Sequence, residues 1–179
     1  LASIGKKALI LWDETVKGLV GEVVLASCRT AGLEWIDVAF GGESTKAEAS
    51  RVAGLAGEGQ ADIVVGVGGG KVLDTAKAAA HQAGVAMVTV PTIASNDSPT
   101  SSFTVWYDEE HRFCGFESWG RNPDLVLVDT QVIARGPLEA FVSGIGDALS
   151  TWVEASVCAK TGYSNLVGTD CYLVGLSEW

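Results

Sequence analysis

Residues 62–71 read Asp-Ile-Val-Val-Gly-Val-Gly-Gly-Gly-Lys, an apolar run that leads directly into three glycines and a lysine. Its apolar run predicts a buried parallel strand over 62–67, and the residues that follow predict a helix over 71–83. Glycines between a strand and a helix let a ligand approach the free amides of the first helical turn, which bind phosphate. The stretch therefore predicts a phosphate-binding turn, although a glycine turn with a purely structural role stays open.

The glycine turn matches neither of the common nucleotide-binding motifs. A strict GxGxxG motif would have glycine where Lys71 stands, and a Walker A loop would have serine or threonine at Val72. A nucleotide hydrolase of the P-loop class is therefore disfavoured.

Strands and helices alternate on both sides of this stretch. Apolar runs predict further strands at 6–12, 34–40, 86–90 and 124–129, with a hairpin over 103–116. Helical spacing predicts helices at 15–31, 45–57 and 137–159. This order is typical of an α/β fold, a parallel-sheet, Rossmann-like nucleotide-binding domain with a β-hairpin. A composition change near 134–137 divides 1–136 from 137–179, the expected start of a helical domain.

Composition excludes several classes of function. The formal net charge of −10 disfavours a nucleic-acid partner or an anionic membrane surface, because phosphate would repel the chain. No apolar run of about 18 residues is present, so no transmembrane helix is expected. The four cysteines form no CxxC pair, which favours reduced thiols and a cytoplasmic protein.

Polar residues follow two of the predicted strands. Asp13 ends the first strand and the loop at 91–101 follows the fourth, so both would lie at the carboxyl edge of the sheet, where ligands bind. Asp13 can bind ribose hydroxyls there, or it can simply begin a helix, where a carboxylate favours the dipole. The loop can contact a cofactor or a polyol, or it can be a hydrophilic connection.

Asp147 lies within the long predicted helix at 137–159. Helical spacing places it on a polar face with Ser143, Ser150, Thr151 and Glu154. Glycines at 144 and 146 cost helix stability, about 1 kcal/mol each, and indicate that something approaches closely. One carboxylate is not by itself a metal site.

Four motifs in a fixed order together carry a family resemblance. They are Gly-Gly-Gly-Lys-Val-Leu-Asp-Thr-Ala-Lys (68–77), Pro-Thr-Ile-Ala-Ser-Asn-Asp-Ser-Pro-Thr-Ser (91–101), Asn-Pro-Asp-Leu-Val-Leu-Val-Asp-Thr (122–130) and Gly-Ile-Gly-Asp-Ala-Leu-Ser-Thr-Trp-Val-Glu-Ala (144–155). Over about residues 6 to 160 the chain resembles an N-terminal fragment of the glycerol dehydrogenases, in the iron-containing alcohol dehydrogenase-like superfamily.

The resemblance implies an NAD-binding α/β domain, a C-terminal helical domain and an active site between them. It implies oxidation of glycerol to dihydroxyacetone with NAD, usually with zinc, in a homo-oligomer. An acid at Asp13 would favour NAD over NADP. With the glycine turn, the implied cofactor contacts are Asp13, Gly68, Gly69, Gly70, Lys71, Val72, Leu73, Asp74, Thr92, Ser95, Ser101, Phe103 and Tyr107. Asp97 would contact the substrate and Asp147 would be the first metal ligand.

The chain departs from the family in its histidines. The family supplies two metal-binding histidines from its helical domain, whereas this chain has only His81 and His111, both before Asp147 and neither in a matching motif. His81 is expected on a helix surface and His111 at a hairpin tip. Residues 163–179 do not match the expected continuation, so a truncated or frameshifted reading frame is our hypothesis. The alternative to an enzyme is therefore a truncated nucleotide-binding module, with an incomplete zinc site and no activity alone.

Overall fold

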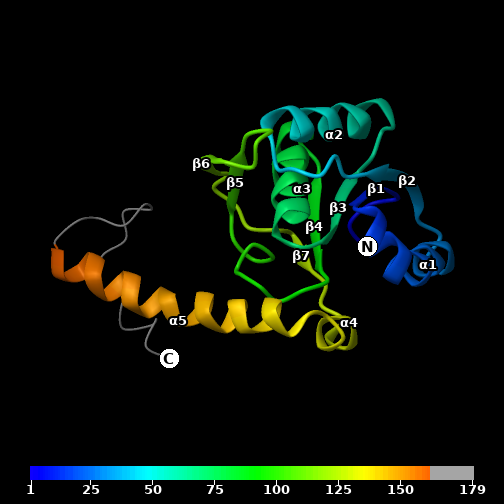
Figure 1. The fold of residues 1–179 in the computed structure, drawn as a ribbon. Helices are drawn as coiled ribbons and strands as arrows, with labels where there is room; N and C mark the ends of the chain where they lie inside the picture. The colour runs from blue at the N-terminus through cyan, green and yellow to red at the C-terminus, as the bar shows by residue number, and fades with distance from the viewer. Residues whose placement is uncertain (162–179) are drawn as a thin grey trace.

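The computed structural model describes residues 1–161, so the predictions for the tail after 161 lie outside the described residues. The described chain forms a five-stranded parallel sheet, in the order β2-β1-β3-β4-β7, and a two-stranded antiparallel hairpin (Figure 1). The strands are β1 Lys7–Trp12, β2 Glu34–Ala39, β3 Ile63–Gly68, β4 Ala86–Pro91, β5 Phe103–Tyr107, β6 Phe113–Ser118 and β7 Leu125–Val126. The helices are α1 Glu14–Thr30, α2 Lys46–Glu58, α3 Gly70–Ala83, α4 Thr130–Ala134 and α5 Leu138–Thr161. The predicted α/β class, parallel sheet and hairpin are confirmed.

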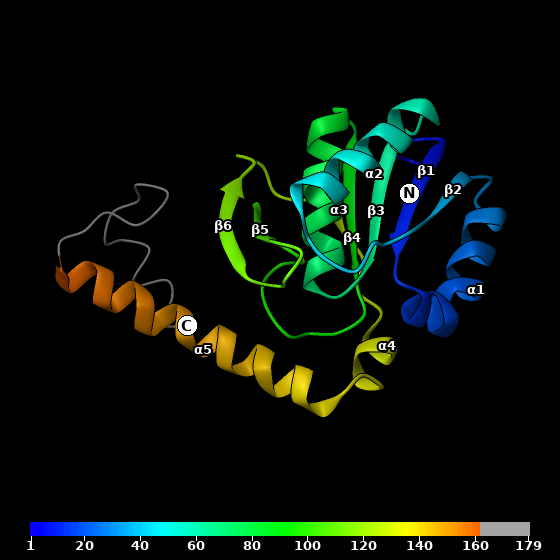
Figure 2. The same ribbon diagram turned by 45° about the horizontal axis from the view of Figure 1, so that its top comes forward.

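Helices cover both faces of the sheet, and successive side chains of its strands point to opposite faces. Leu9 and Leu11 of β1 pack on one face, against α2 and α3. Ala8 and Ile10 pack on the other face, which α1 covers (Figure 2). Every residue of the central strand β3 is buried, which explains the near-continuous apolar run that predicted it.

The direction of chain winding reverses at β1, since β2 and β3 pair with opposite edges of this strand. In open parallel sheets such a reversal leaves a crevice at the carboxyl ends of the two strands, where ligands bind. Asp13 follows β1 and the glycine turn follows β3, so the fold places both at this crevice.

Two elements differ from the sequence prediction. The strand expected at 124–129 is only Leu125–Val126, flanked by the Asp124 carboxylate, which accepts the N–H of Met87, and by the N–H of Leu127, which donates to Thr89. The short helix α4 was not predicted. The Asp129 side chain begins it by accepting the N–H groups of Gln131 and Val132, as a helix N-cap does.

The last helix, α5, leaves the sheet and runs past the loop that follows β4 (Figures 1 and 2). Gly144 allows this approach, because a Cβ there would lie 2.1 Å from the Ala94 carbonyl oxygen. The expectation of a close approach is thus confirmed for Gly144, whereas nothing lies within 4 Å of a Cβ at Gly146. The apolar residues of α5, including Phe141 and Leu149, are exposed.

Among the described helices, none combines the length and the apolar character needed to cross a membrane.

Replacing Gly66 with alanine should lower the free energy of unfolding by about 1–3 kcal/mol. The new Cβ would lie 2.7 Å from the Cβ of Ala76 and 3.4 Å from the Cα of Leu73, where α3 packs on β3. Urea denaturation measures the change. Gly54→Ala is the control, because nothing lies within 4 Å of its Cβ and alanine favours the helix. Equal effects of the two substitutions would contradict the close packing of α3 on β3.

Candidate functional site

A cleft of about 690 Å³ opens at the N-terminus of α3. Its walls are the first turn of α3, the loop after β4, the hairpin and the polar face of α5. The lining residues are Gly70, Lys71, Asp74, Asn96, Asp97, Ser98, Ser101, Phe103, Val105, Tyr107, Phe116, Asp147, Ser150, Thr151 and Glu154. Eight of the residues predicted from the sequence are therefore brought together in one space, namely Gly70, Lys71, Asp74, Asp97, Ser101, Phe103, Tyr107 and Asp147.

The first turn of α3 offers backbone N–H groups to this cleft. Gly69 is the N-cap residue and has no side chain, so no side-chain cap accepts these hydrogen bonds. The start of a helix without such a cap is a site for a phosphate or a carboxylate. The glycines also have a structural role, because a Cβ at Gly69 would lie 3.1 Å from Ile93 and one at Gly70 would lie 3.0 Å from Asn96.

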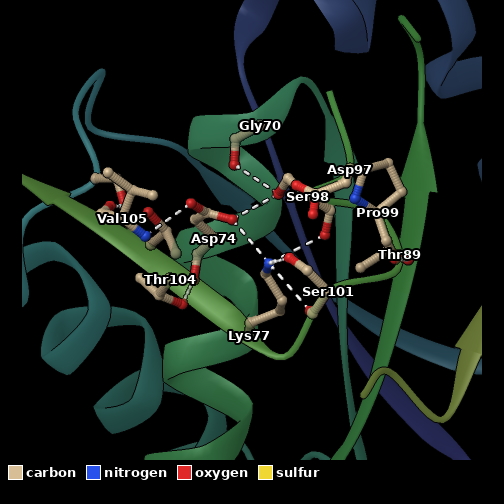
Figure 3. Close-up of polar contacts among 12 residues, drawn as sticks. Gly70, Asp74, Lys77, Thr89, Asp97, Ser98, Pro99, Ser101, Thr104 and Val105 are labelled. Carbon is tan, nitrogen blue, oxygen red and sulfur yellow. Dashed lines mark hydrogen bonds and ion pairs between the residues drawn. The ribbon is translucent and has the colours of Figure 1, made fainter. Parts of the chain in front are cut away.

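A buried ion pair joins the cleft walls (Figure 3). Lys77 is 1% exposed, and its Nζ lies 2.9 Å from the Asp74 carboxylate. The same ammonium group donates to the carbonyl oxygens of Ser98 (3.0 Å) and Ser101 (3.3 Å) and to the Ser101 hydroxyl. This lysine thus ties the loop after β4 to α3.

The Asp74 carboxylate extends the same network to the hairpin. It accepts hydrogen bonds from the Ser98 hydroxyl (2.5 Å) and from the backbone N–H of Val105 in β5 (2.9 Å). Thr104 also donates its hydroxyl to the Asp74 carbonyl oxygen. The carboxylate that the resemblance placed at the cofactor therefore also holds the loop and the hairpin in position. No sequence pattern predicts a role for Lys77, because only the fold reveals that it is buried.

Two acidic residues, Asp97 and Asp147, are in contact where the loop meets α5. The backbone N–H of Asp97 donates to Oδ2 of Asp147 over 3.0 Å. Although Asp97 is exposed in the cleft, the surrounding protein desolvates its carboxyl group and, with the negative charge of Asp147, raises its pKa. The polar face expected for α5 thus lies along the cleft, and its hydroxyl and carboxylate groups can bind a polyol.

The described residues do not complete a metal site. No group of three or more His, Cys, Asp or Glu side chains in residues 1–161 could hold an ion. His81 stacks on Trp119, with ring centres 4.6 Å apart, and His111 contacts Glu43, so neither lines the cleft. Asp147 with Asp97 alone does not fit the closed donor set of a zinc site.

A second buried carboxylate, Glu43, was not predicted. It accepts hydrogen bonds from Lys71 Nζ (2.6 Å), from His111 Nδ1 (2.5 Å) and from the backbone N–H of Ser44 (2.8 Å). Burial opposes its ionisation, but these hydrogen bonds outweigh that effect and lower the pKa of Glu43. Its position after β2, at the same carboxyl edge as Asp13, was the signal that could have found it.

The remaining predicted residues lie outside the cleft lining. Asp13 caps α1 by accepting the N–H of Val16 through Oδ1, so the capping role left open by the sequence is confirmed. A carboxylate has two oxygens, so capping does not preclude a ribose contact. Val72 and Leu73 are buried, and the Leu73 N–H donates to Gly69 within the helix. The others outside the lining are Gly68, Gly69, Thr92 and Ser95.

Comparison with known proteins decides the family. A family model described as iron-containing alcohol dehydrogenase matches residues 1–130. The chain belongs to this family. It is 47% identical over 93% of its length to a glycolaldehyde reductase of Halobacterium salinarum, and 39% identical over 99% to a glycerol dehydrogenase of Escherichia coli. A crystal structure of a probable glycerol dehydrogenase from Sinorhizobium meliloti matches 92% of the chain at a TM-score of 0.83 and 41% identity.

This iron-containing alcohol dehydrogenase chain spans about half the length of the relatives it matches. It covers 46% of the Halobacterium protein, 48% of the Escherichia protein and 44% of the Sinorhizobium chain. The resemblance predicted from the four motifs is confirmed at the level of the family, and the fold matches part of the longer homologues.

Replacing Lys77 with methionine should lower the free energy of unfolding by about 3–5 kcal/mol, because it leaves the buried Asp74 carboxylate without its cation. Urea denaturation measures the loss. Lys46→Met is the control, since Lys46 pairs with Glu117 at the surface, and such pairs contribute about 1 kcal/mol or less. A loss no larger than the control's would contradict the anchoring role of the buried pair.

Proposed function

We propose that this chain is the NAD-binding part of a dehydrogenase that transfers hydride between a small polyol, glycerol first, and NAD. One observation carries the proposal. The cleft brings the uncapped start of α3, the Lys71 cation and the Asp97 carboxylate into one space, in a chain of the iron-containing alcohol dehydrogenase family. The anion-binding part and the hydroxyl-binding part of the required site are thus neighbours.

The residues present fit a dinucleotide. In the proposal the amides of Gly70 and Lys71, together with the Lys71 ammonium, bind its diphosphate. Asp13 accepts hydrogen bonds from the adenosine ribose, and its charge disfavours a 2′-phosphate. The other proposed cofactor contacts are Gly68, Gly69, Val72, Leu73, Asp74, Thr92, Ser95, Ser101, Phe103 and Tyr107. When bound, NAD supplies the hydride acceptor of the reaction.

Asp97 is the proposed substrate contact. Its carboxyl group lies at the cleft surface beside Asp147, and the pKa of Asp97 is raised by burial and by that neighbouring charge. A carboxyl group in this position accepts a hydrogen bond from a polyol hydroxyl, or donates one to it, and so orients the carbon that loses hydride. The family resemblance implies a zinc ion with Asp147 as its first ligand. The described residues do not complete that site, so no step is derived through a metal.

The proposal also covers the organisation of the chain. Residues 1–136 form the NAD-binding domain and 137–179 begin a helical domain, and the enzyme works in the cytoplasm as a homo-oligomer. For the 179-residue chain by itself, we propose cofactor binding without turnover, because the sequence has no histidine after Asp147.

A second substrate has specific support. The relative from Halobacterium salinarum, at 47% identity, is a glycolaldehyde reductase. The same cleft would then serve reduction of a two-carbon hydroxyaldehyde, with Asp97 contacting its hydroxyl group. Glycolaldehyde differs from dihydroxyacetone, the oxidised form of glycerol, by a hydrogen in place of one hydroxymethyl group, so one hydride-transfer chemistry serves both.

The fluorescence of NADH should increase when it binds the chain, and a titration should give a measurable Kd. Lys71→Gln should weaken this binding ten- to a hundredfold, because a charge-assisted hydrogen bond contributes about 1.5–3 kcal/mol. Lys46→Gln makes the same change of charge away from the cleft lining and should leave the Kd unchanged. No binding of NADH by the wild-type chain at millimolar concentration would refute the proposed function.

Turnover separates the enzyme from the binding module. The purified chain with glycerol, NAD and zinc should form negligible NADH, and glycolaldehyde with NADH should give negligible oxidation. Absorbance at the NADH band is the measurement, and a longer relative of the family is the positive control. Turnover that a chelator abolishes would show that the chain by itself completes a metal site and would contradict the module.

A further inference from the structure

The carboxylate of Glu43 is held at one edge of the cleft by groups from three parts of the fold. Lys71 donates from the first turn of α3, His111 from the tip of the hairpin, and Ser44 from the loop that precedes α2. Glu43 is 8% exposed, so this charge is shielded from water. Shielding by protein strengthens its effect on neighbouring charges.

Hydrogen bonds of the adjacent residue, Ser44, fix the backbone at Glu43 independently of its charge. The hydroxyl of the fully buried Ser44 donates to the Val105 carbonyl oxygen over 3.0 Å. The N–H of Tyr107 donates to the Ser44 carbonyl oxygen over 3.0 Å. The backbone that carries Glu43 is therefore attached to β5, which is a wall of the cleft, while the Lys71, His111 and Ser44 donors hold its carboxylate.

The negative charge of Glu43 changes how Lys71 can bind a ligand. The Lys71 ammonium lies 2.6 Å from Glu43 and 5.0 Å from the ring centre of Tyr107. The lysine side chain is held between these two groups, which reduces the entropy it loses when a ligand binds. Glu43 also offsets the positive charge of Lys71. The start of α3 therefore presents amide dipoles and a cation whose charge Glu43 partly offsets.

We propose that Glu43 determines specificity by disfavouring ligands whose phosphates carry more negative charge than the diphosphate of NAD. This inference rests on the proposed function. The diphosphate of NAD is esterified at both ends, whereas the terminal phosphate of ADP carries further negative charge. A buried carboxylate beside Lys71 repels that extra charge, so the site favours a dinucleotide over a nucleoside diphosphate.

The ratio of two dissociation constants tests this effect. The Kd of NADH comes from its fluorescence, and the Kd of ADP comes from displacement of bound NADH. Glu43→Gln should lower the ratio of the ADP Kd to the NADH Kd about fivefold, the effect of one charge across several ångströms of partly screened space. Damage to the fold alone would weaken the binding of both ligands together and leave the ratio of the two Kd values unchanged.

Two further variants complete the experiment. Glu117→Gln also removes the acidic partner of a lysine, but that lysine, Lys46, does not line the cleft as Lys71 does, so the ratio should stay within twofold. His111→Glu places a second carboxylate beside Glu43 at a side chain that is 69% exposed, and should raise the ratio about fivefold. This variant decides the matter if Glu43→Gln does not fold.

An unchanged ratio in folded Glu43→Gln would overturn the inference, and so would an unchanged ratio in His111→Glu. In both cases NADH binding by the wild-type chain would leave the proposed function standing. A wild-type chain that binds neither nucleotide would overturn the proposed function and this inference together.

Discussion

The buried ion pair between Asp74 and Lys77 is the constraint on which the cleft depends. Removing two charges from water is costly, and a buried pair is tolerated when further hydrogen bonds satisfy its remaining donors and acceptors. Here those bonds come from Ser98, Ser101 and Val105, which belong to the loop after β4 and to the hairpin. The hydrogen bonds that the two buried charges require therefore hold the loop after β4 and the hairpin against α3.

The sheet places this helix where a ligand can use it. The winding reverses at β1, and the crevice of such sheets lies at the carboxyl ends of the strands on either side of the reversal. The start of α3 opens there without a side-chain cap. The glycines that precede the helix serve two purposes, since they admit the loop after β4 and leave amides free for an anion. The structural and functional interpretations of the glycine turn are thus compatible.

The long helix α5 completes the cleft with one face and leaves its other face exposed. Asp147 contacts the loop that carries Asp97, and Ser150 and Glu154 line the cleft. Phe141, Leu149 and other apolar side chains of the same helix are exposed. The described part of this iron-containing alcohol dehydrogenase chain therefore holds the proposed cofactor site and one edge of the proposed substrate site.

The α/β fold and the glycine turn could be predicted from the sequence, because apolar runs, helical spacing and glycines act over a few residues. Most of the predicted residues that meet in the cleft, such as Ser101 and Tyr107, were implied by the family resemblance and not by a local pattern. The burial of Lys77 and the contacts of Glu43 with Lys71 and the hairpin emerge only in the folded chain. They depend on contacts between residues distant in the sequence, and such contacts leave no periodic signal. The short helix α4 has a local N-cap at Asp129, but its five residues are too few for a helical period to reveal.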